Sequence, residues 1–517
     1  MRIRKLTTLL LGLFLIVQTS AQTGVGNVQP LIRSTPEKEG VSSKAILDFV
    51  NAVEQSKNEF HSFMLLRHGK VIAESWWNPY RADLKHTMYS CSKSFTATAI
   101  GFCVAEKRLT VNAKVIAFFP NDLPDTVSAN LAAMEVKDLL SMSAGQEPEP
   151  NYVPARDTNW VRGFLAAPVV NKPGTKFLYN SIATYMLSAI VTKVTGQSVI
   201  DYLRPRLFDP LGISDIDWET DPRGINTGGW GLRIRTEDLA KFGQLFLQKG
   251  DWKGTQILPA SWIEEASTKK IMQNPNATAE QLASNDWLQG YCYQMWRCRN
   301  NAYRGDGAYG QYIIVMPDQD AVISITSETN NMQDELNLIF KYLLPALQDG
   351  NADVSDKASA AALKKKLASL SLPAPKKISD SAFKAVAAGK SEFKKSGDQP
   401  GFKSVAFDFT KKNCVVTFST DSAVYPIGFS ASSWKLGKTN KKGAYLVARA
   451  KNNLEGLAPF AVAGSYRWLD AQTLQLTLRY IESPHTETYT CKFDSEKVDV
   501  EIGQSFNNEK KHWEGTR

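Results

Sequence analysis

The chain contains little cysteine and histidine, with six Cys and five His among 517 residues. Six cysteines are too few for a disulfide framework at this length, and we expect Cys91 and Cys103, within an apolar helical pattern, to be buried thiols. A bridge between Cys414 and Cys491, in strand-like segments, stays open as an alternative. No His-Glu-x-x-His motif occurs, which together with the few histidines argues against a zinc site. We expect neither a metal nor an organic cofactor.

No dense run of basic residues interleaved with aromatics occurs either, although the formal net charge is +9. Residues 351–517 carry 26 basic and 17 acidic side chains, whereas residues 22–350 are slightly acidic. This distribution argues against a nucleic-acid partner. We expect the C-terminal charge to be a solvated lysine surface, with weak contact to an anionic cell-wall polymer as the alternative.

No hydrophobic run is long enough to span a bilayer, which takes about 20 apolar residues. The first 21 residues instead have the pattern of an export signal. Three basic residues precede the apolar run 9–17, and Thr19 and Ala21 lie at the small-residue positions before a cleavage site. No cysteine follows that site, which argues against a lipid anchor. We therefore expect a protein without a membrane anchor that is exported to the periplasm or secreted.

Apolar periodicity predicts an α+β arrangement for the first two thirds of the chain. A hairpin is expected over 63–77, and apolar residues at every fourth position predict a helix after Tyr89. The further expected elements are helices over 136–142, 184–195, 236–248 and 336–347 and strands over 312–316 and 321–326.

The composition changes near residue 352. Ala, Ser and Lys dominate up to residue 370 and two prolines follow, which predicts a helix and a linker. Short alternating segments then predict a small antiparallel β domain, either a sandwich or a barrel, with strands over 405–409, 415–418, 445–447, 474–478 and 488–491. The expected boundaries are 1–21 for the signal peptide, 22–347 for the α+β domain, 348–380 for the helix and linker and 381–517 for the C-terminal β-rich domain.

Two common functional signals are excluded. The chain has no Gly-x-Ser-x-Gly elbow, which argues against an α/β-hydrolase. Residues 305–310 match the dinucleotide-binding pattern, but a strand-like segment follows them where that motif requires a helix.

Ser90 and Lys93 form the candidate reactive pair. Residues three apart on a helix lie on one face, and a serine in the first turn lies near the positive end of the helix dipole. A lysine desolvated in the core can have its pKa lowered enough to accept the serine proton. The same spacing recurs elsewhere, for example at Ser267 and Lys270, so a capping serine and a surface lysine are the alternative interpretation.

The order of five segments supports the catalytic interpretation. Ser90-Cys91-Ser92-Lys93 resembles the nucleophile motif of the serine β-lactamase and penicillin-binding-protein superfamily, class C and esterase branch. Four further segments resemble that family in the same order, namely 139–145, 173–181, 228–232 and 305–307. The resemblance covers about residues 35–345. It implies a serine hydrolase whose domain has an antiparallel sheet flanked by helices and an all-helical part, followed here by the β domain.

The resemblance also implies residue roles. Ser90 resembles the nucleophile and Lys93 its base partner. Tyr179 resembles the tyrosine that protonates the leaving group and later activates water, which suits it if nearby cations lower its pKa from about 10. A packing role is the alternative for Tyr179. The implied oxyanion hole consists of the backbone N–H groups of Ser90 and Ala308.

The second motif departs from the family pattern, since Tyr179-Asn180-Ser181 replaces Tyr-x-Asn. Asn180 and Ser181 are both candidates for substrate binding, but the usual polar side chain that positions a substrate amide is in doubt.

The third motif also departs, because Gly305-Asp306-Gly307 lacks the usual Lys or His, and Arg304 is the nearest cation. We expect these four residues to contact substrate, the glycines by allowing close backbone approach. A substrate carboxylate would need a cation there, and Asp306 would repel it unless Arg304 compensates. We therefore expect weak or no β-lactamase activity and neutral ester or amide substrates.

His86 is the histidine best placed for a Ser-His mechanism, but we expect it to be structural because no elbow or oxyanion motif accompanies it. The expected function is an exported serine hydrolase that cleaves ester or amide bonds of a small molecule or short peptide through an acyl-enzyme on Ser90. The alternatives are a D-amino-acid peptidase acting on cell-wall-like peptides and a non-catalytic binding protein that retains the fold.

Overall fold

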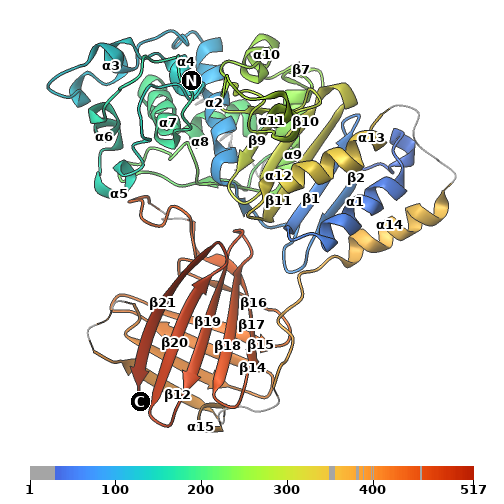
Figure 1. The fold of residues 1–517 in the computed structure, drawn as a ribbon, viewed down its shortest axis with the longest axis vertical. Helices are drawn as coiled ribbons and strands as arrows, with labels where there is room; N and C mark the ends of the chain where they lie inside the picture. The colour runs from blue at the N-terminus through green and yellow to red at the C-terminus, as the bar shows by residue number, and fades with distance from the viewer. Residues whose placement is uncertain are drawn as a thin grey trace, which may run out of the picture.

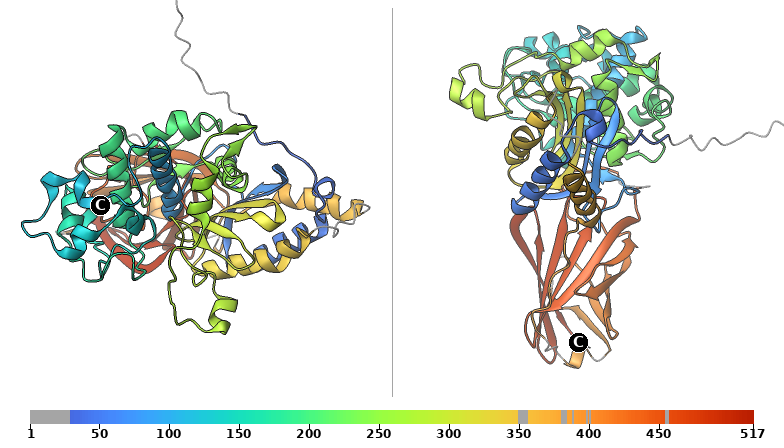
Figure 2. Two further views of the ribbon diagram at one scale, coloured as in Figure 1. Left: turned by 90° about the horizontal axis from the view of Figure 1, so that it is seen from above. Right: turned by 90° about the vertical axis from the view of Figure 1, so that its right-hand side faces the viewer.

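The computed structural model describes residues 29–348, 356–379, 384–387, 389–397, 399, 401–453 and 457–517. The expected signal peptide lies outside the described residues. An N-terminal α+β part and a C-terminal β domain lie end to end, as Figures 1 and 2 show. The expected α+β class with a following β domain is confirmed.

A six-stranded antiparallel sheet forms the centre of one half of the N-terminal part. Its order is β2-β1-β11-β10-β9-β8, and its strands are β1 (Glu59–Arg67), β2 (Lys70–Trp76), β8 (Trp296–Arg297), β9 (Tyr303–Gly307), β10 (Gln311–Met316) and β11 (Ala321–Glu328). Because side chains alternate along a strand, Phe63 and Leu65 of β1 enter one core while Met64 and Leu66 enter another. The first core packs against helix α1 (Ser43–Gln55), and the second against α9 (Thr236–Leu247).

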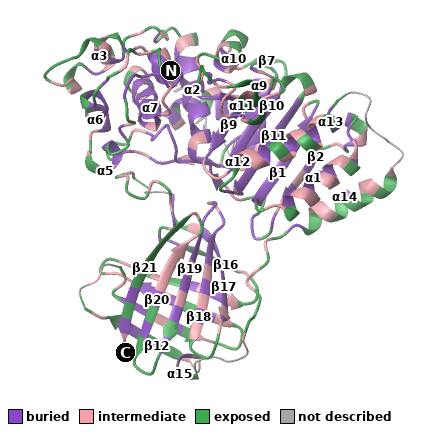
Figure 3. Ribbon diagram, in the orientation of Figure 1, coloured by how far each residue is buried: buried purple, intermediate pink, exposed green. Residues whose placement is uncertain are grey.

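The other half of this part is helical, built around α2 (Ser92–Ala105). Twelve consecutive residues of α2, Ser92 to Cys103, are buried, as expected for a helix surrounded by protein. Its neighbour α7 (Ser181–Thr195) packs along it. Figure 3 shows α2 and the central strands buried and the peripheral helices partly exposed. The remaining helices of the N-terminal part include α3 (Ala129–Ala133), α4 (Val136–Leu140), α5 (Val153–Arg156), α6 (Trp160–Ala166), α8 (Val199–Leu203), α10 (Ala260–Ser267), α11 (Ala279–Ser284) and α12 (Met332–Leu338).

The hairpin, helices and strands expected for this part are present within a few residues of their expected bounds. The closing helix differs, because α12 passes into a π-helical turn (Ile339–Leu343) and a short α13 (Leu344–Ala346). Pro345 lacks the N–H that would continue the α-helical ladder at this point, which accounts for the irregularity.

The C-terminal domain follows α14 (Lys357–Ser369), which packs on α1. Ten strands form one sheet in the order β15-β14-β13-β12-β21-β20-β19-β18-β17-β16, and a further pairing of β15 with β17 closes it into a barrel rather than a sandwich. The strands are β12 (Lys390–Lys395), β13 (Ser404–Phe409), β14 (Asn413–Ser419), β15 (Val424–Ala431), β16 (Lys435–Thr439), β17 (Phe460–Trp468), β18 (Thr473–Tyr480), β19 (Thr486–Phe493), β20 (Lys497–Gln504) and β21 (Asn507–Thr516).

The strand expected over 445–447 is wrong. These residues lie in the connection between β16 and β17, which rises toward α5 in Figure 1. Its backbone bonds to the N-terminal part, since Lys451 N donates to Pro154 O over 2.7 Å and Asn453 N donates to Thr220 O over 2.7 Å. Contacts with the other domain therefore override the local β preference of Tyr445-Leu446-Val447.

All six cysteines are in the described part of the chain, and all are buried and free, so Cys414 and Cys491 form no bridge. Within the described ranges, every helix is too short or too polar to cross a membrane.

Candidate active site

The nucleophile candidate lies on a strained turn. A short strand, β3 (His86–Thr87), leads into a 3₁₀ turn over Tyr89–Cys91, and α2 begins directly after it. Tyr89 has a φ of 44°, in the left-handed region that non-glycine residues rarely adopt. Tyr89 and Cys91 are buried, whereas Ser90 between them is partly exposed. The turn thus presents Ser90 to solvent while its neighbours anchor it.

Lys93 lies one turn along the chain from Ser90. Its Nζ is 3.0 Å from Ser90 Oγ, 3.2 Å from Ser181 Oγ and 2.6 Å from the Gly229 carbonyl oxygen. Burial lowers the pKa of Lys93 to about 7, against the opposing effect of the Glu149 and Asp306 charges. A large fraction of the amine is therefore neutral near pH 7 and can accept the Ser90 proton.

Tyr179 reaches the same pair. Lys93 Nζ lies 4.9 Å from the centre of its ring, and Ser90 is one of the groups that act on the pKa of its hydroxyl. Its ring stacks on Trp296 with centroids 5.7 Å apart. Burial and the nearby Asp306 charge raise the pKa of Tyr179 well above its usual value, opposite to the lowering that we expected. Tyr179 therefore stays protonated and can donate a proton, whereas the neutral amine of Lys93 can accept one.

The two candidates of the second motif have different surroundings. Asn180 is buried and caps α7, because its Oδ1 accepts from the N–H groups of Ile182 at 3.0 Å and Ala183 at 2.9 Å. Its amide nitrogen donates to Gln146 Oε1 over 2.8 Å. Ser181, in contrast, lines the cleft and contacts Lys93. Geometry thus gives Asn180 a structural role and places Ser181 beside the reactive amine.

The third motif buries its charges. Arg304 has no exposed surface, and its Nε donates to Asp306 Oδ2 over 3.0 Å. Its guanidinium lies over the Trp287 ring, with the carbon 4.3 Å from the centroid, and donates to the Asp286 carbonyl over 3.0 Å. We expected Arg304 to contact substrate, but these contacts hold it in the interior, and Asp306 is its ion-pair partner.

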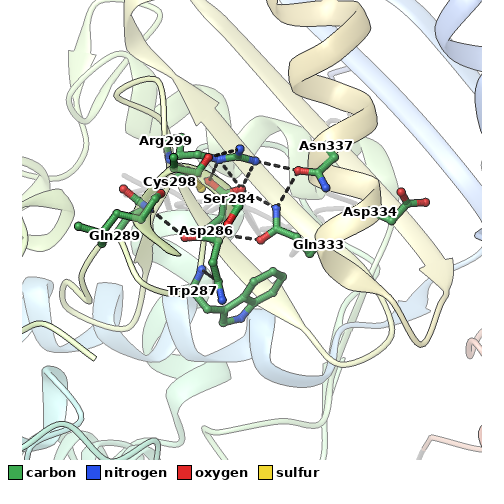
Figure 4. A network of polar contacts seen from close by, with 12 residues as sticks. Ser284, Asp286, Trp287, Gln289, Cys298, Arg299, Gln333, Asp334 and Asn337 are labelled. Atoms are coloured by element: carbon green, nitrogen blue, oxygen red, sulfur yellow. Dashed lines mark hydrogen bonds and ion pairs between the residues drawn. The ribbon is translucent and has the colours of Figure 1, made fainter. Parts of the chain in front are cut away.

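A polar network fixes the loop around Asp286, whose carbonyl accepts from Arg304 (Figure 4). The buried carboxylate of Asp286 accepts from Arg299 Nη2 over 2.8 Å and from Gln333 Nε2 over 2.7 Å. Asn337 Oδ1 accepts from the same arginine over 2.8 Å. These bonds join the loop around Asp286 to α12 and so restrict the carbonyl that Arg304 contacts.

Gly305 and Gly307 leave room for the protein itself rather than for a substrate. A Cβ on Gly305 would lie 2.7 Å from Ser94 Oγ, and one on Gly307 would lie 2.0 Å from the Met88 carbonyl oxygen. Strand β9 therefore packs directly on the nucleophile turn. This close packing brings Ala308, which follows β9, to the same cleft as Ser90.

The cleft in front of Ser90 has a volume of about 1070 Å³. Ser90, Ser181 and Ala308 line it from the N-terminal part. Two segments of the C-terminal domain also line it, namely 445–450 and the region of Phe506. Sequence reasoning missed both, because they lie more than 350 residues from Ser90 and no local pattern connects them.

Glu149 is a further cleft residue that sequence reasoning missed. Its Oε1 accepts from Ser181 N over 2.6 Å, and its charge acts on Lys93. Burial raises the pKa of Glu149, and the Ser181 N–H and the Lys93 charge oppose that rise. A carboxylate between Pro148 and Pro150, shortly after the 139–145 motif, was the available signal.

The ring nitrogens of His86 contact other residues than Ser90. Its Nε2 contacts His61 Nδ1 at 3.1 Å and its Nδ1 contacts the Thr87 carbonyl at 3.0 Å, so both ring nitrogens are occupied. Burial and the neighbouring His61 lower its pKa well below the usual value. His86 is structural, as expected.

Comparisons with known proteins identify the family of this chain. The family model "Beta-lactamase" matches residues 52–346. The 6-aminohexanoate-dimer hydrolase of Paenarthrobacter ureafaciens is 24% identical over 314 residues, which cover 56% of this chain and 78% of that protein. The D-aminopeptidase of Brucella anthropi is 22% identical over 192 residues, which cover 35% of this chain and 36% of that protein.

Two solved structures are similar in fold. A family VIII carboxylesterase has a TM-score of 0.48 and 16% identity, covering 61% of this chain and 99% of its own. The octameric penicillin-binding protein homologue from Pyrococcus abyssi has a TM-score of 0.47 and 14% identity, covering 92% of this chain and 99% of its own. The family-model match extends over more than half of the chain, from the last turn of α1 to the end of α13. The chain belongs to the β-lactamase family of serine hydrolases.

Proposed function

We propose that the protein is an exported hydrolase that cleaves neutral ester or amide bonds through an acyl-enzyme on Ser90. The observation that carries this proposal is the 3.0 Å contact between Ser90 Oγ and Lys93 Nζ, together with the lowered pKa of Lys93. A serine next to a neutral amine is an activated nucleophile.

The reaction follows from the positions of three side chains. Lys93 accepts the hydroxyl proton as Ser90 Oγ bonds to the substrate carbonyl carbon. The backbone N–H groups of Ser90 and Ala308, which line the same cleft, then hold the oxyanion. Tyr179 gives its proton to the leaving oxygen or nitrogen as that bond breaks, and Lys93 returns a proton to Tyr179. Water then repeats the sequence on the acyl-enzyme and releases the acid.

The preference for neutral substrates rests on the third motif. Arg304, the cation nearest to that position in the sequence, is buried and paired with Asp306. A substrate carboxylate entering there would meet no free guanidinium. The two relatives named above are, by their names, a hydrolase of the 6-aminohexanoate dimer and a D-aminopeptidase, so we include amides in the substrate panel.

Labelling with a fluorophosphonate, followed by peptide mapping, tests the nucleophile. We expect one adduct per chain, on Ser90, and none on the Ser90→Ala variant. Ser267→Ala is the matched control, because Ser267 has the same spacing to Lys270 and its hydroxyl bonds to a helix carbonyl. Labelling of Ser90→Ala would refute the proposal by assigning another nucleophile. An unlabelled native protein would refute it and leave a non-catalytic binding protein as the alternative.

Substrate class is tested with p-nitrophenyl acetate, the linear dimer of 6-aminohexanoate and D-alanine p-nitroanilide. We expect turnover of the ester, and turnover of D-alanine p-nitroanilide would demonstrate amide cleavage. The linear dimer ends in a carboxylate, so its efficient turnover would contradict the preference for neutral substrates. Export is tested separately, since a cleaved signal leaves a mature chain that begins at Gln22 on N-terminal sequencing.

A further inference from the structure

One histidine of the C-terminal domain, His485, contacts Tyr89 in the nucleophile turn and Tyr309, the residue after Ala308. His485 precedes β19 and is completely buried. Tyr89, in the nucleophile turn, and His485 form a hydrogen bond of 2.6 Å between the hydroxyl and Nε2. The ring of Tyr309 meets the His485 ring edge-on, with centroids 4.9 Å apart and planes at 85°.

These two tyrosines have unusual backbones. Tyr89 has a φ of 44° and Tyr309 a φ of 67°, both in the left-handed region. Such conformations persist in a non-glycine residue when the surrounding structure holds them. Tyr89 directly precedes Ser90, and Tyr309 directly follows Ala308. The two strained residues therefore flank the two N–H groups assigned to the oxyanion hole.

His485 is itself held in one orientation by the N-terminal part. Its Nδ1 lies 2.6 Å from Glu328 Oε1, at the end of β11. The carboxylate can only accept, so Nδ1 carries the proton and Nε2 accepts from the Tyr89 hydroxyl. Ser505 donates to the same carboxylate oxygen over 2.6 Å, and the Phe506 ring packs on the imidazole at a centroid distance of 4.3 Å.

We infer that His485 is a positioning residue for acylation. It sets the backbone at Tyr89 and Tyr309 and thereby aligns the N–H groups of Ser90 and Ala308. The inference rests on the proposed function. It makes the C-terminal domain part of the catalytic unit. His485 belongs to that domain, and its two ring nitrogens bond to Glu328 and Tyr89, which both belong to the N-terminal part.

The test measures how fast full-length variants react with the fluorophosphonate. His485→Phe keeps an aromatic ring but removes both hydrogen bonds, and Tyr89→Phe removes the hydroxyl alone. We expect the labelling rate constant, and kcat for p-nitrophenyl acetate, to fall about 10- to 100-fold in His485→Phe with KM little changed. Labelling should still reach one adduct per chain. A misfolded fraction would lower this end point rather than the rate constant, so the end point distinguishes a slow reaction from misfolding.

A double-mutant cycle identifies the hydrogen bond as the cause. If Tyr89 and His485 act through each other, His485→Phe/Tyr89→Phe reacts no more slowly than the slower single variant. His512→Phe, an exposed histidine of the same domain, is the matched control and should react as fast as the native chain. If His485→Phe does not fold, the labelling rate constant of Tyr89→Phe alone decides whether the hydrogen bond matters. We expect that rate constant to fall as well.

The outcomes separate this inference from the proposed function. A native chain that is not labelled on Ser90 defeats both. A native chain that is labelled on Ser90, with His485→Phe and Tyr89→Phe reacting at the native rate, defeats the positioning role alone. Fully additive losses in the double variant also defeat it, because the two residues would then act independently.

Discussion

Arg304 and Asp306 form an ion pair inside the protein, with Arg304 Nη2 3.0 Å from Asp306 Oδ2. Neither charge is left for a ligand, since Arg304 has no exposed surface and Asp306 is 7% exposed. Burial raises the pKa of Asp306 and Arg304 opposes that rise, so Asp306 depends on Arg304 for its charged state. Breaking the pair to bind a substrate carboxylate would leave a buried charge unpaired, which is costly.

The first prediction concerns substrate charge. Valerate and glutarate p-nitrophenyl esters have equal chain length, but the glutarate monoester ends in a carboxylate. We expect kcat/KM for the charged ester to be about 100-fold lower, because the carboxylate loses water without gaining a buried cation. A spectrophotometric assay of p-nitrophenol release measures both.

Nitrocefin extends the same test to a β-lactam, for which we expect weak or no hydrolysis. Exposed cations at the cleft, such as Arg449 and Lys511, should compensate little because exposed ion pairs contribute little and are screened by salt. Equal turnover of the two esters would show that a cation does reach the substrate.

The second prediction concerns pH. Only the neutral amine of Lys93 can accept the Ser90 proton, so the labelling rate should rise with pH through a midpoint near the Lys93 pKa of about 7. The Glu149 charge raises that pKa. Glu149→Gln should therefore shift the midpoint to lower pH, by about one unit. The labelling rate at pH 6, as a fraction of the maximal rate of the same protein, should be higher in this variant than in the native chain.

Glu147→Gln is the control for this shift. Glu147 is on the same loop but is exposed and pairs with Lys176 at 2.6 Å, so its loss should leave the midpoint unchanged. A midpoint that stays in place or moves upward in Glu149→Gln would contradict the assignment of Lys93 as the base.

The residues recognised from the sequence are those whose relationship is local. Ser90 and Lys93 are one helical turn apart, so their contact follows from helix geometry, and Tyr179 was found through its motif. The protonation state of Tyr179 was not predictable, because it depends on burial and on Asp306, 127 positions further on. The order of the five family-like segments, together with the spacing, thus predicted this pair, and tertiary packing determines its electrostatics.

The contribution of the C-terminal domain was hidden for the same reason. Four of the ten strands that the structure describes there were predicted from alternation, namely β13, β14, β18 and β19. Tyr445 and His485, in contrast, contact Glu219 and Tyr89, several hundred residues earlier. Tyr445-Leu446-Val447 has strand-like composition, yet it forms a loop because it packs on the neighbouring domain. Local propensity cannot register such a partner.

The third prediction separates the two candidates of the second motif. Asn180→Ala removes the oxygen that accepts from Ile182 N and Ala183 N, so we expect a loss of about 1–2 kcal/mol in the free energy of unfolding. KM for p-nitrophenyl acetate should change little. Denaturant unfolding measures the first and steady-state kinetics the second. Asn180→Ser, which keeps a capping oxygen, should lose less stability; a raised KM with native stability would instead indicate substrate contact.

The fourth prediction tests Tyr179 as the proton donor to the leaving group. Its raised pKa keeps the phenol protonated throughout the working range, so Tyr179→Phe removes a proton donor rather than a base. Alkoxide and amide leaving groups need that proton, whereas p-nitrophenolate leaves without it. We therefore expect kcat for an alkyl ester or an accepted amide to fall about 100-fold or more and kcat for p-nitrophenyl acetate to fall much less.

Since Tyr179 stacks on Trp296, Phe keeps the ring contact and separates the effect of the hydroxyl from the effect of packing. Equal losses for good and poor leaving groups would assign the hydroxyl to Ser90 activation, and no loss for either would make Tyr179 a packing residue.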